Sequence, residues 1–296
     1  MSFIFSSRRR QKPKPPPPLT LDRIPEGETI GLIAGNSTFP LRFADRARAR
    51  NCRVVSICHH DETLTEISSH VDESRWIKVG QLGAIIEFFK SYGVTRVAMV
   101  GGINRVRLFG GVKLDARGAA LLLRLRSSKD DVIMRGIADE LANEGIEVIS
   151  SVVFMQEDLV PEGIVAGPNL SRDEQNDIEI GRSALRAMSG EDIGQLVVVR
   201  DGVIVAVEAV EGSDATIRRG GELGGKGTVV VKCAKPTQDM RFDVPIVGEK
   251  TLETLAAAGA RVMALEAGRC LILDREDVAG RAEKNRITIV GTPPLV

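Results

Sequence analysis

A short segment between two prolines carries the residue types that phosphoryl chemistry requires. It reads KPTQDMRFDVP and spans residues 235–245. Alternate residues of an extended chain share a face, so we predict that Asp239, Arg241 and Asp243 line one strip. Carboxylate oxygens are ligands for hard cations, and a guanidinium can bind two phosphoryl oxygens at once. The strip therefore suggests metal-assisted hydrolysis of a diphosphate, and a ladder of surface ion pairs is the structural alternative.

A second group of acids recurs every three residues at the end of a predicted strand. Glu208, Glu211 and Asp214 lead into a Gly-Ser turn, which we expect to open a helix that runs to Arg218 and Arg219. Three carboxylates so placed could meet a divalent cation or supply a base for water. The alternative is structural, because the helix dipole stabilises acids near a helix N-terminus.

Two glycine turns follow predicted strands and could bind an anion. The first lies in GLIAGNSTFP and places Gly35 and Asn36 at the start of a predicted helix, where backbone N–H groups point toward a ligand. The second is Gly101-Gly102, at the carboxyl end of another strand, where parallel sheets bind ligands. The first turn does not match the dinucleotide fingerprint GxGxxG. Phosphate or sugar binding and plain turn glycines are the two interpretations of this pattern.

The run Cys58-His59-His60-Asp61 has the composition of a metal site but not its geometry. Neighbouring side chains of an extended segment point to opposite faces, so they do not readily share one ion. The four cysteines of the chain also lack the paired short spacing of a zinc ribbon or a disulfide framework. We therefore expect no zinc here, and a reducing compartment.

Charge and hydropathy argue against two classes of protein. The chain has 40 basic and 40 acidic residues, but its first twenty residues hold five of the basic residues and no acid. The remainder has 35 basic against 40 acidic residues, a net charge of −5 that does not favour nucleic-acid binding. Its apolar runs fall far short of the roughly 18 residues that a membrane span requires.

The chain divides into a tail and two predicted domains. Residues 1–25 are basic and proline-rich, which indicates a disordered arm that either aids solubility or is weakly attracted to an anionic membrane surface. The order of apolar and basic residues in this arm is not that of a signal peptide. Because 296 residues exceed what one core usually serves, we predict domains at 26–160 and 161–296.

In the first domain, short apolar runs alternate with helical periodicity, which predicts βαβ units and a parallel, doubly wound sheet. The predicted strands are 29–34, 53–58, 75–79, 95–100 and 146–150, with helices at 40–50, 83–92, 118–126 and 130–143. In the second domain, Asp201-Gly202 between two apolar runs predicts a hairpin and hence mixed strand directions. Its predicted strands are 194–200, 203–208, 228–233, 261–265, 270–273 and 287–290, with helices at 172–188, 249–258 and 275–284.

Four longer segments carry motifs across most of the chain. They read GLIAGNSTFP, KDDVIMRGIADELANEGIEV, DIGQLVVVRDGVIVAVEAVEGSDATIRR and KPTQDMRFDVPIVGEKTLETLAAAGARVMALEAGRCLILD, within residues 29–291. Together they resemble the LpxI family of UDP-2,3-diacylglucosamine diphosphatases. The resemblance implies an α/β fold with a Rossmann-like, parallel-sheet N-terminal domain and a distinct mixed α/β C-terminal domain, with the lipid substrate held between them.

The resemblance also implies an activity. Members hydrolyse UDP-2,3-diacylglucosamine to UMP and 2,3-diacylglucosamine 1-phosphate in lipid A biosynthesis, with Mg²⁺ or Mn²⁺ as the cofactor. Their essential aspartate falls in the motif that reads RFDVP here, so Asp243 is the first choice for metal ligand or base. The usual Glu-Gly-Thr-Asp motif has Ser213 in the threonine position, which retains the hydroxyl.

Under this hypothesis, each candidate residue has an expected role. Cationic Arg219 and Lys235, with Arg241, would neutralise phosphoryl oxygens, and Gln195 and Gln238 would orient the uridine or the sugar. The candidate catalytic residues are Asp243, Asp239, Arg241, Glu211 and Asp214, and the candidate metal ligands are Asp243, Asp239 and Glu208. The candidate substrate contacts are Gly35, Asn36, Gly101, Gly102, Gln195, Arg219, Lys235, Thr237 and Gln238.

The implied partner is a nucleotide-linked lipid sugar, and no nucleic acid. An amphiphilic substrate implies transient contact with the inner-membrane surface, so we expect a cytoplasmic protein, free or peripheral on that membrane. A homodimer is the default oligomeric expectation. The alternatives are a non-catalytic protein that binds a nucleotide-linked lipid sugar and a dinucleotide-dependent oxidoreductase, which only the first βαβ unit supports.

Overall fold

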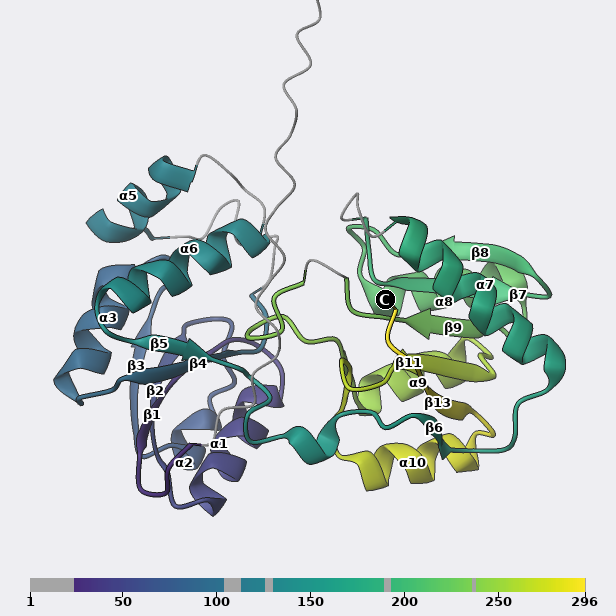
Figure 1. Cartoon of the computed structure of the whole chain (residues 1–296), viewed down its shortest axis with the longest axis horizontal. Helices are drawn as coiled ribbons and strands as arrows, with labels where there is room; N and C mark the ends of the chain where they lie inside the picture. The colour runs from purple at the N-terminus through teal and green to yellow at the C-terminus, as the bar shows by residue number, and fades with distance from the viewer. Residues whose placement is uncertain (1–23, 104–112, 126–129, 189–192, 236–237, 296) are drawn as a thin grey trace, which may run out of the picture.

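The computed structural model describes residues 24–103, 113–125, 130–188, 193–235 and 238–295. These residues form two α/β regions, each built on its own main sheet (Figure 1). The predicted fold class is confirmed, because the first main sheet is entirely parallel and the second contains both strand directions. Residues 1–23 of the predicted tail lie outside the described residues.

The N-terminal sheet has five parallel strands in the order β3-β2-β1-β4-β5. The strand order reverses between β1 and β4, which makes the space outside their carboxyl ends a topological switch point, where open α/β sheets bind ligands. The strands are β1 (Thr29–Ala34), β2 (Arg53–His59), β3 (Glu73–Ile77), β4 (Arg96–Val100) and β5 (Glu147–Ile149).

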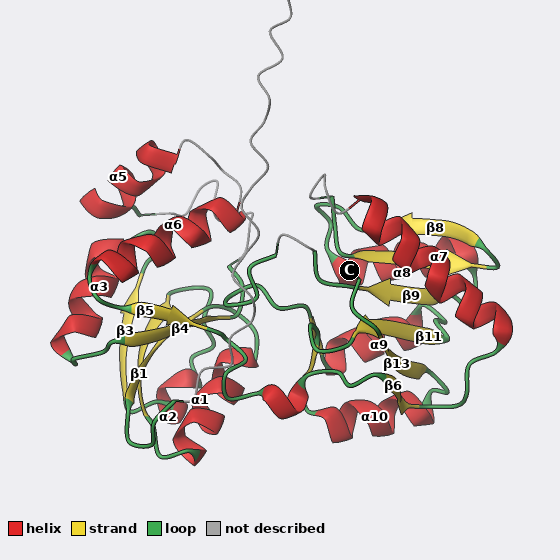
Figure 2. Ribbon diagram, in the orientation of Figure 1, coloured by secondary structure: helices red, strands yellow, loops and turns green. Residues whose placement is uncertain are grey.

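Helices cover both faces of this sheet (Figure 2). Phe43 of α1 and Ile67 of α2 pack in one apolar core with alternate residues of β1, and Phe89 of α3 and Leu141 of α6 pack in the other. The helices are α1 (Phe39–Ala49), α2 (Ile67–His70), α3 (Leu82–Ser91), α5 (Ala116–Leu125) and α6 (Asp130–Asn143).

The second main sheet has six strands in the order β6-β13-β11-β9-β7-β8. β9, β11 and β13 are parallel, whereas β6, β7 and β8 are each antiparallel to a neighbour. The strands are β6 (Gly163–Ala166), β7 (Leu196–Arg200), β8 (Val203–Val207), β9 (Val229–Lys232), β11 (Val262–Glu266) and β13 (Thr288–Thr292). A separate parallel pair is formed by β10 (Ile246–Val247) and β12 (Leu271–Ile272).

Four helices cover the second sheet. Ile178 of α7 packs in the core on one face, and Ile217 of α8, Leu252 of α9 and Val278 of α10 pack in the core on the other. These helices are α7 (Arg172–Met188), α8 (Ser213–Gly224), α9 (Glu249–Ala257) and α10 (Arg275–Lys284), and a 3₁₀ turn, η1 (Gln156–Asp158), precedes β6. No helix among the described residues is both long and apolar enough to cross a membrane.

Local sequence explains the entry to α7 and the β7–β8 hairpin. Ser171 and Glu174 form a reciprocal capping box, because each side chain accepts a hydrogen bond from the other's backbone amide. Asp201 and Gly202 have φ values of 48° and 81°, as the predicted two-residue turn requires. The carboxylate of Asp177 accepts hydrogen bonds from both turn amides and stabilises that conformation.

Candidate active site at the carboxyl edge of the parallel sheet

Residues 238–243 form a turn, and our prediction of an extended strip was wrong. The amides of Phe242 and Asp243 both donate to the carbonyl of Asp239, at 3.2 and 3.0 Å. The Asp239 side chain also accepts a hydrogen bond from the Arg241 amide at 3.2 Å. Aspartate commonly captures nearby backbone amides in this way, and such local bonds compete with extended structure. The three charged side chains are therefore distributed around a turn and do not share one strand face.

Within this turn, Arg241 holds Asp239 with two hydrogen bonds. Its Nε lies 3.0 Å from Oδ1 and its Nη2 lies 2.8 Å from Oδ2, the bidentate geometry of a strong ion pair. Asp239 is 1% exposed, and these hydrogen bonds raise the pKa of the Arg241 guanidinium. Arg135 of α6 lies 3.9 Å from Asp239 as a second cation. Asp239 thus fixes the guanidinium, whose side chain is 31% exposed.

The turn belongs to the second half of the chain but packs on the first sheet. Met240 lies in the core on the α1 face of that sheet, and Phe242 lies in the core on the α3 face. The amide of Ser151, just beyond β5, donates to the carbonyl of Arg241 at 2.7 Å. Figure 1 shows this yellow-green segment reaching across to the carboxyl ends of the N-terminal strands. Asp243 is exposed at this edge.

The predicted glycine turns meet at the switch point between β1 and β4. Gly35 donates its amide to Val100 at 2.8 Å, and Asn36 donates its amide to Gly102 at 2.8 Å. A Cβ on Gly35 would overlap the carbonyl of Gly102, and Gly101 adopts a φ of +86°. This close approach of two backbones explains the glycines structurally. Binding of an anion above them stays a prediction.

Three predicted substrate contacts form one hydrogen-bonded group near the end of β9. Gln238 donates from Nε2 to Oε1 of Gln195 at 3.3 Å and accepts the amide of Lys235 at 2.8 Å. Gln238 is buried, so both amide side chains serve to hold the segment that leads into the turn. Thr237 lies outside the described residues.

Glu208 connects the predicted acidic group to these glutamines. It is buried, and its carboxylate accepts the hydroxyl of Ser213 at 3.0 Å and the amide of Gln195 at 3.3 Å. A path of hydrogen bonds therefore leads from the start of α8 through Glu208 and Gln195 to Gln238. This places Glu208 in support of the turn, and its predicted role as a metal ligand stays a prediction.

Glu211 and Asp214 do not share one site in this structure. Glu211 pairs with Arg219 at 2.6 Å, and Asp214 pairs with Lys250 of α9 at 3.3 Å. Hydrogen bonds from its own backbone amide and from Arg219 lower the pKa of Glu211. Asp214 lies in the first turn of α8 and Glu211 just before its N-cap, Gly212, so the helix dipole favours both acids, in agreement with the structural alternative.

Comparison with known proteins agrees with the motifs. The model of the LpxI N-terminal domain matches residues 29–157, and that of the LpxI C-terminal domain matches residues 161–290. A protein of Caulobacter vibrioides, UDP-2,3-diacylglucosamine pyrophosphatase LpxI, is 30% identical over 278 residues, which cover 90% of this chain and 98% of that protein. The chain belongs to the LpxI family.

Likeness to solved structures adds nothing to this assignment. The biotin carboxylase domain of Hydrogenobacter thermophilus 2-oxoglutarate carboxylase matches with a TM-score of 0.27 and 12% identity, over 61% of this chain and 36% of that one. An N5-carboxyaminoimidazole ribonucleotide synthetase matches with a TM-score of 0.27 and 12% identity, over 70% and 47%. This LpxI chain thus spans less than half the length of either structure, and at such scores neither likeness carries a functional argument.

The described residues of this LpxI chain do not form a cage of protein ligands for a cation. Among them, no three His, Cys, Asp or Glu side chains gather as a metal site. Asp239 is held by Arg241, and Glu208 by Ser213 and a backbone amide, so a cation would have to displace these partners. Mg²⁺ often binds through one or two carboxylates together with substrate phosphates. The carboxylate of Asp243 is exposed at the sheet edge, which is compatible with this second kind of site.

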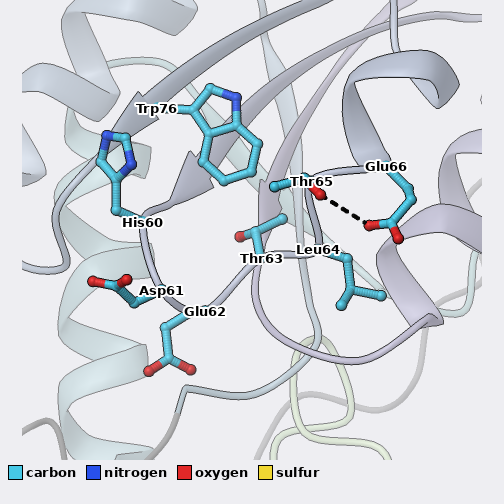
Figure 3. Close-up of a pocket in the computed structure, with 8 residues that line it drawn as sticks. All are labelled: His60, Asp61, Glu62, Thr63, Leu64, Thr65, Glu66 and Trp76. Atoms are coloured by element: carbon cyan, nitrogen blue, oxygen red, sulfur yellow. Dashed lines mark hydrogen bonds between the residues drawn. The ribbon is translucent and has the colours of Figure 1, made fainter.

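Two features of this LpxI structure were not predicted as parts of a site. Arg135 lies within the motif KDDVIMRGIADELANEGIEV, but nothing in local periodicity indicates that it approaches Asp239. A surface pocket also opens at the carboxyl ends of β2 and β3, beside the glycine turns (Figure 3). Its lining includes His60, which we had considered only as a metal ligand, and Trp76, the single tryptophan of the chain.

Proposed function

We propose that this chain hydrolyses the diphosphate bond of UDP-2,3-diacylglucosamine and releases UMP and 2,3-diacylglucosamine 1-phosphate. The observation that carries the proposal is its 30% identity to the Caulobacter pyrophosphatase along 98% of that protein. The turn at 238–243 supports it, because the turn sets a cationic fork and an exposed carboxylate at the ligand-binding edge of a parallel sheet.

Arg241 would bind the diphosphate in this reaction. Its Nε and Nη2 are committed to Asp239, so the guanidinium is already oriented before substrate arrives, and Nη1 lies outside that pair. The guanidinium carbon of Arg241 also lies 5.6 Å from the centre of the Phe242 ring, and this contact further limits the motion of the side chain. A fixed cation stabilises the charge that develops on a leaving phosphate without reorganisation during the step.

Asp243 would act directly at the diphosphate, as the base that accepts a proton from water or as a ligand of the cation. A divalent cation, Mg²⁺ or Mn²⁺, would offset the negative charge of the diphosphate when bound. The glycine turns of β1 and β4 would let phosphate oxygens approach the backbone closely, beside the N-terminus of α1. Because the substrate carries acyl chains, we further propose that the protein meets it at the inner-membrane surface. A homodimer stays a prediction.

The test is release of UMP from UDP-2,3-diacylglucosamine by purified protein, with Mg²⁺, with Mn²⁺ and with EDTA. Cation-dependent release that EDTA abolishes would support the whole proposal. Release that is unaffected by EDTA would support the hydrolase and contradict the cation requirement. Saturable substrate binding without release under any of these conditions would instead support a binding protein. Saturable binding of NADH would revive the oxidoreductase alternative.

A further inference from the structure

A pocket in the N-terminal region lies apart from the catalytic turn. It opens at the carboxyl ends of β2 and β3, and in Figure 3 the Trp76 ring lies above Thr63, with His60 to one side and Thr65 to the other. The rings of His60 and Trp76 are 5.7 Å apart at their centres and tilted by 39°. The residues that line the pocket are His60, Asp61, Glu62, Thr63, Leu64, Thr65, Glu66 and Trp76.

Backbone contacts hold the walls of this pocket in place. The amide of His60 donates to the carbonyl of Ile77 at 3.0 Å, which ties the loop after β2 to the end of β3. The hydroxyl of Thr63 donates to the carbonyl of Ala34 at 2.6 Å and accepts the amide of His59 at 2.9 Å. Ala34 immediately precedes the glycine turn, so the pocket and the crevice have a fixed relation to each other.

The lining chemistry selects one part of a nucleotide sugar. The carboxylates of Asp61, Glu62 and Glu66 would repel a phosphate. The apolar side chains Leu64 and Trp76 offer too little surface to bind acyl chains. Aromatic rings offer stacking faces to a planar base. Carboxylates and hydroxyls accept hydrogen bonds from ribose hydroxyls and from the N–H of a base. An uncharged nucleoside therefore fits this lining better than the charged or lipid parts of the substrate.

The position of the pocket agrees with the length of a nucleoside diphosphate. Asn36 of the glycine turn donates from Nδ2 to the carboxylate of Glu62 at 3.4 Å, so the pocket borders the crevice. In the order β3-β2-β1-β4-β5, the pocket and the crevice are two strand spacings apart, about 10 Å at the usual separation of strands. This is comparable to the distance from the base to the terminal phosphate of an extended nucleoside diphosphate. The Arg241 turn is bonded further along the same edge, where the amide of Ser151, just beyond β5, donates to the Arg241 carbonyl.

We propose that this pocket is the nucleoside subsite, in which the base stacks on Trp76 and His60 while the diphosphate extends over Gly35 and Gly102 toward Arg241. The inference rests on the proposed function for the identity of the nucleotide, which is then UMP or a uridine diphosphate ester. It predicts that nucleoside recognition belongs to the N-terminal sheet, whereas the groups that act on the diphosphate come from the second half of the chain.

Because Trp76 is the single tryptophan, the intrinsic fluorescence of the full chain reports on this pocket. We expect titration with UMP to change the emission in a saturable way, and ribose 5-phosphate and glucosamine 1-phosphate to have no such effect at equal concentrations. A response to glucosamine 1-phosphate without a response to UMP would overturn the proposal, because the pocket would then bind the sugar end. A response to NADH without one to UMP would also overturn it.

Variants test the stacking contact independently of fluorescence. Trp76→Leu and His60→Ala should each weaken UMP binding, measured by equilibrium dialysis, by about 5- to 150-fold. Trp76→Phe keeps an aromatic face and should restore most of the affinity. Tyr92→Leu is the matched control, because Tyr92 packs against Phe88 on the opposite face of the sheet and should bind UMP normally. Thermal melts would confirm that each variant is folded.

The two proposals can fail separately. Saturable UMP binding with no change in Trp76 emission, or an affinity within twofold of wild type in folded Trp76→Leu, would overturn the nucleoside subsite and leave the hydrolase intact. Absence of turnover with every cation, while UMP still changes the emission, would overturn the proposed function and leave the subsite supported.

Discussion

The Arg241 guanidinium binds both carboxylate oxygens of Asp239, and this pair sits where a segment from the second half of the chain meets the first sheet. Asp239 is almost fully buried, while Arg241 is partly exposed. One partner is therefore anchored in the protein and the other is presented to a ligand. This division of roles differs from the expectation that both acids of the motif hold a cation.

Asp239→Asn should affect both stability and catalysis. The amide keeps the shape but loses the charge, so we expect the free energy of unfolding to fall by about 1.5–3 kcal/mol, the range for hydrogen bonds to charged groups. Because the Arg241 guanidinium would no longer be held in place, we expect kcat to fall by about 100-fold. Urea unfolding and UMP release measure the two effects. A loss of stability with unchanged kcat would show that the pair is structural only.

Arg241→Lys tests the guanidinium fork itself. Lysine keeps the positive charge but cannot make two parallel hydrogen bonds, so a single contact has to serve both Asp239 and the diphosphate. We expect kcat to fall by about 100-fold, the effect of removing one fixed donor to a developing charge. Activity close to wild type would mean that charge alone suffices at this position.

Asp243→Asn should abolish most turnover and leave folding nearly unchanged. The side chain is exposed, so its replacement costs little packing. The amide cannot act as a base and is a poor ligand for a hard cation. UMP release and a thermal melt check the two halves of the prediction. Asp277→Asn, at an exposed position in the first turn of α10, is the matched control and should keep full activity.

Gly35→Ala should push the backbones of the two glycine turns apart. The added Cβ would overlap the carbonyl of Gly102, which is backbone and cannot rotate away, so we expect a destabilisation of about 1–3 kcal/mol. The KM for substrate should rise because the crevice changes shape. Gly280→Ala in α10 is the control, since its Cβ would meet no atom within 4 Å and should stabilise the helix by about 0.5–1 kcal/mol. Equal effects of the two changes on KM would contradict this role of the crevice.

His59 should make the stability of the N-terminal region depend on pH. It is 5% exposed, and burial lowers its pKa below the ordinary value of 6.5, although a hydrogen bond with the Ala34 carbonyl opposes this. The unfolded chain therefore takes up a proton at a higher pH than the folded chain, and stability falls as the pH drops through 6.5. The Tm should decrease between pH 7.5 and pH 5.5. His59→Asn, which can still donate to Ala34, should reduce that decrease, and an unchanged slope would assign the effect to other groups.

Much of the secondary structure could be predicted because its causes are local. Most predicted helices and strands agree with the observed bounds to within two residues, as for Thr29–Ala34, Asp130–Asn143 and Arg172–Met188, but α8 continues to Gly224 beyond the expected end at Arg219. The signals are hydrophobic periodicity, the Asp201-Gly202 turn and the glycines at helix ends. Each acts over a few residues, so it can be recognised from the sequence alone. β6 was missed because Gly163–Ala166 pairs with β13, whose sequence lies more than 120 residues away.

The motif residues could also be recognised from the sequence, because KPTQDMRFDVP and the LpxI resemblance depend on residue types alone. The arrangement of these residues in space could not be predicted in this way. Side chains alternate between two faces only where the chain is extended. Here the Asp239 carboxylate accepts a hydrogen bond from the amide of Arg241 and is itself buried against the first sheet. The meeting of Gly35 with Gly102, and of Trp76 with His60, follows from the order of strands in the sheet. Residue types therefore specified the chemistry available to this protein, whereas contacts between distant segments specified which groups lie together, because strand order and burial depend on the whole chain.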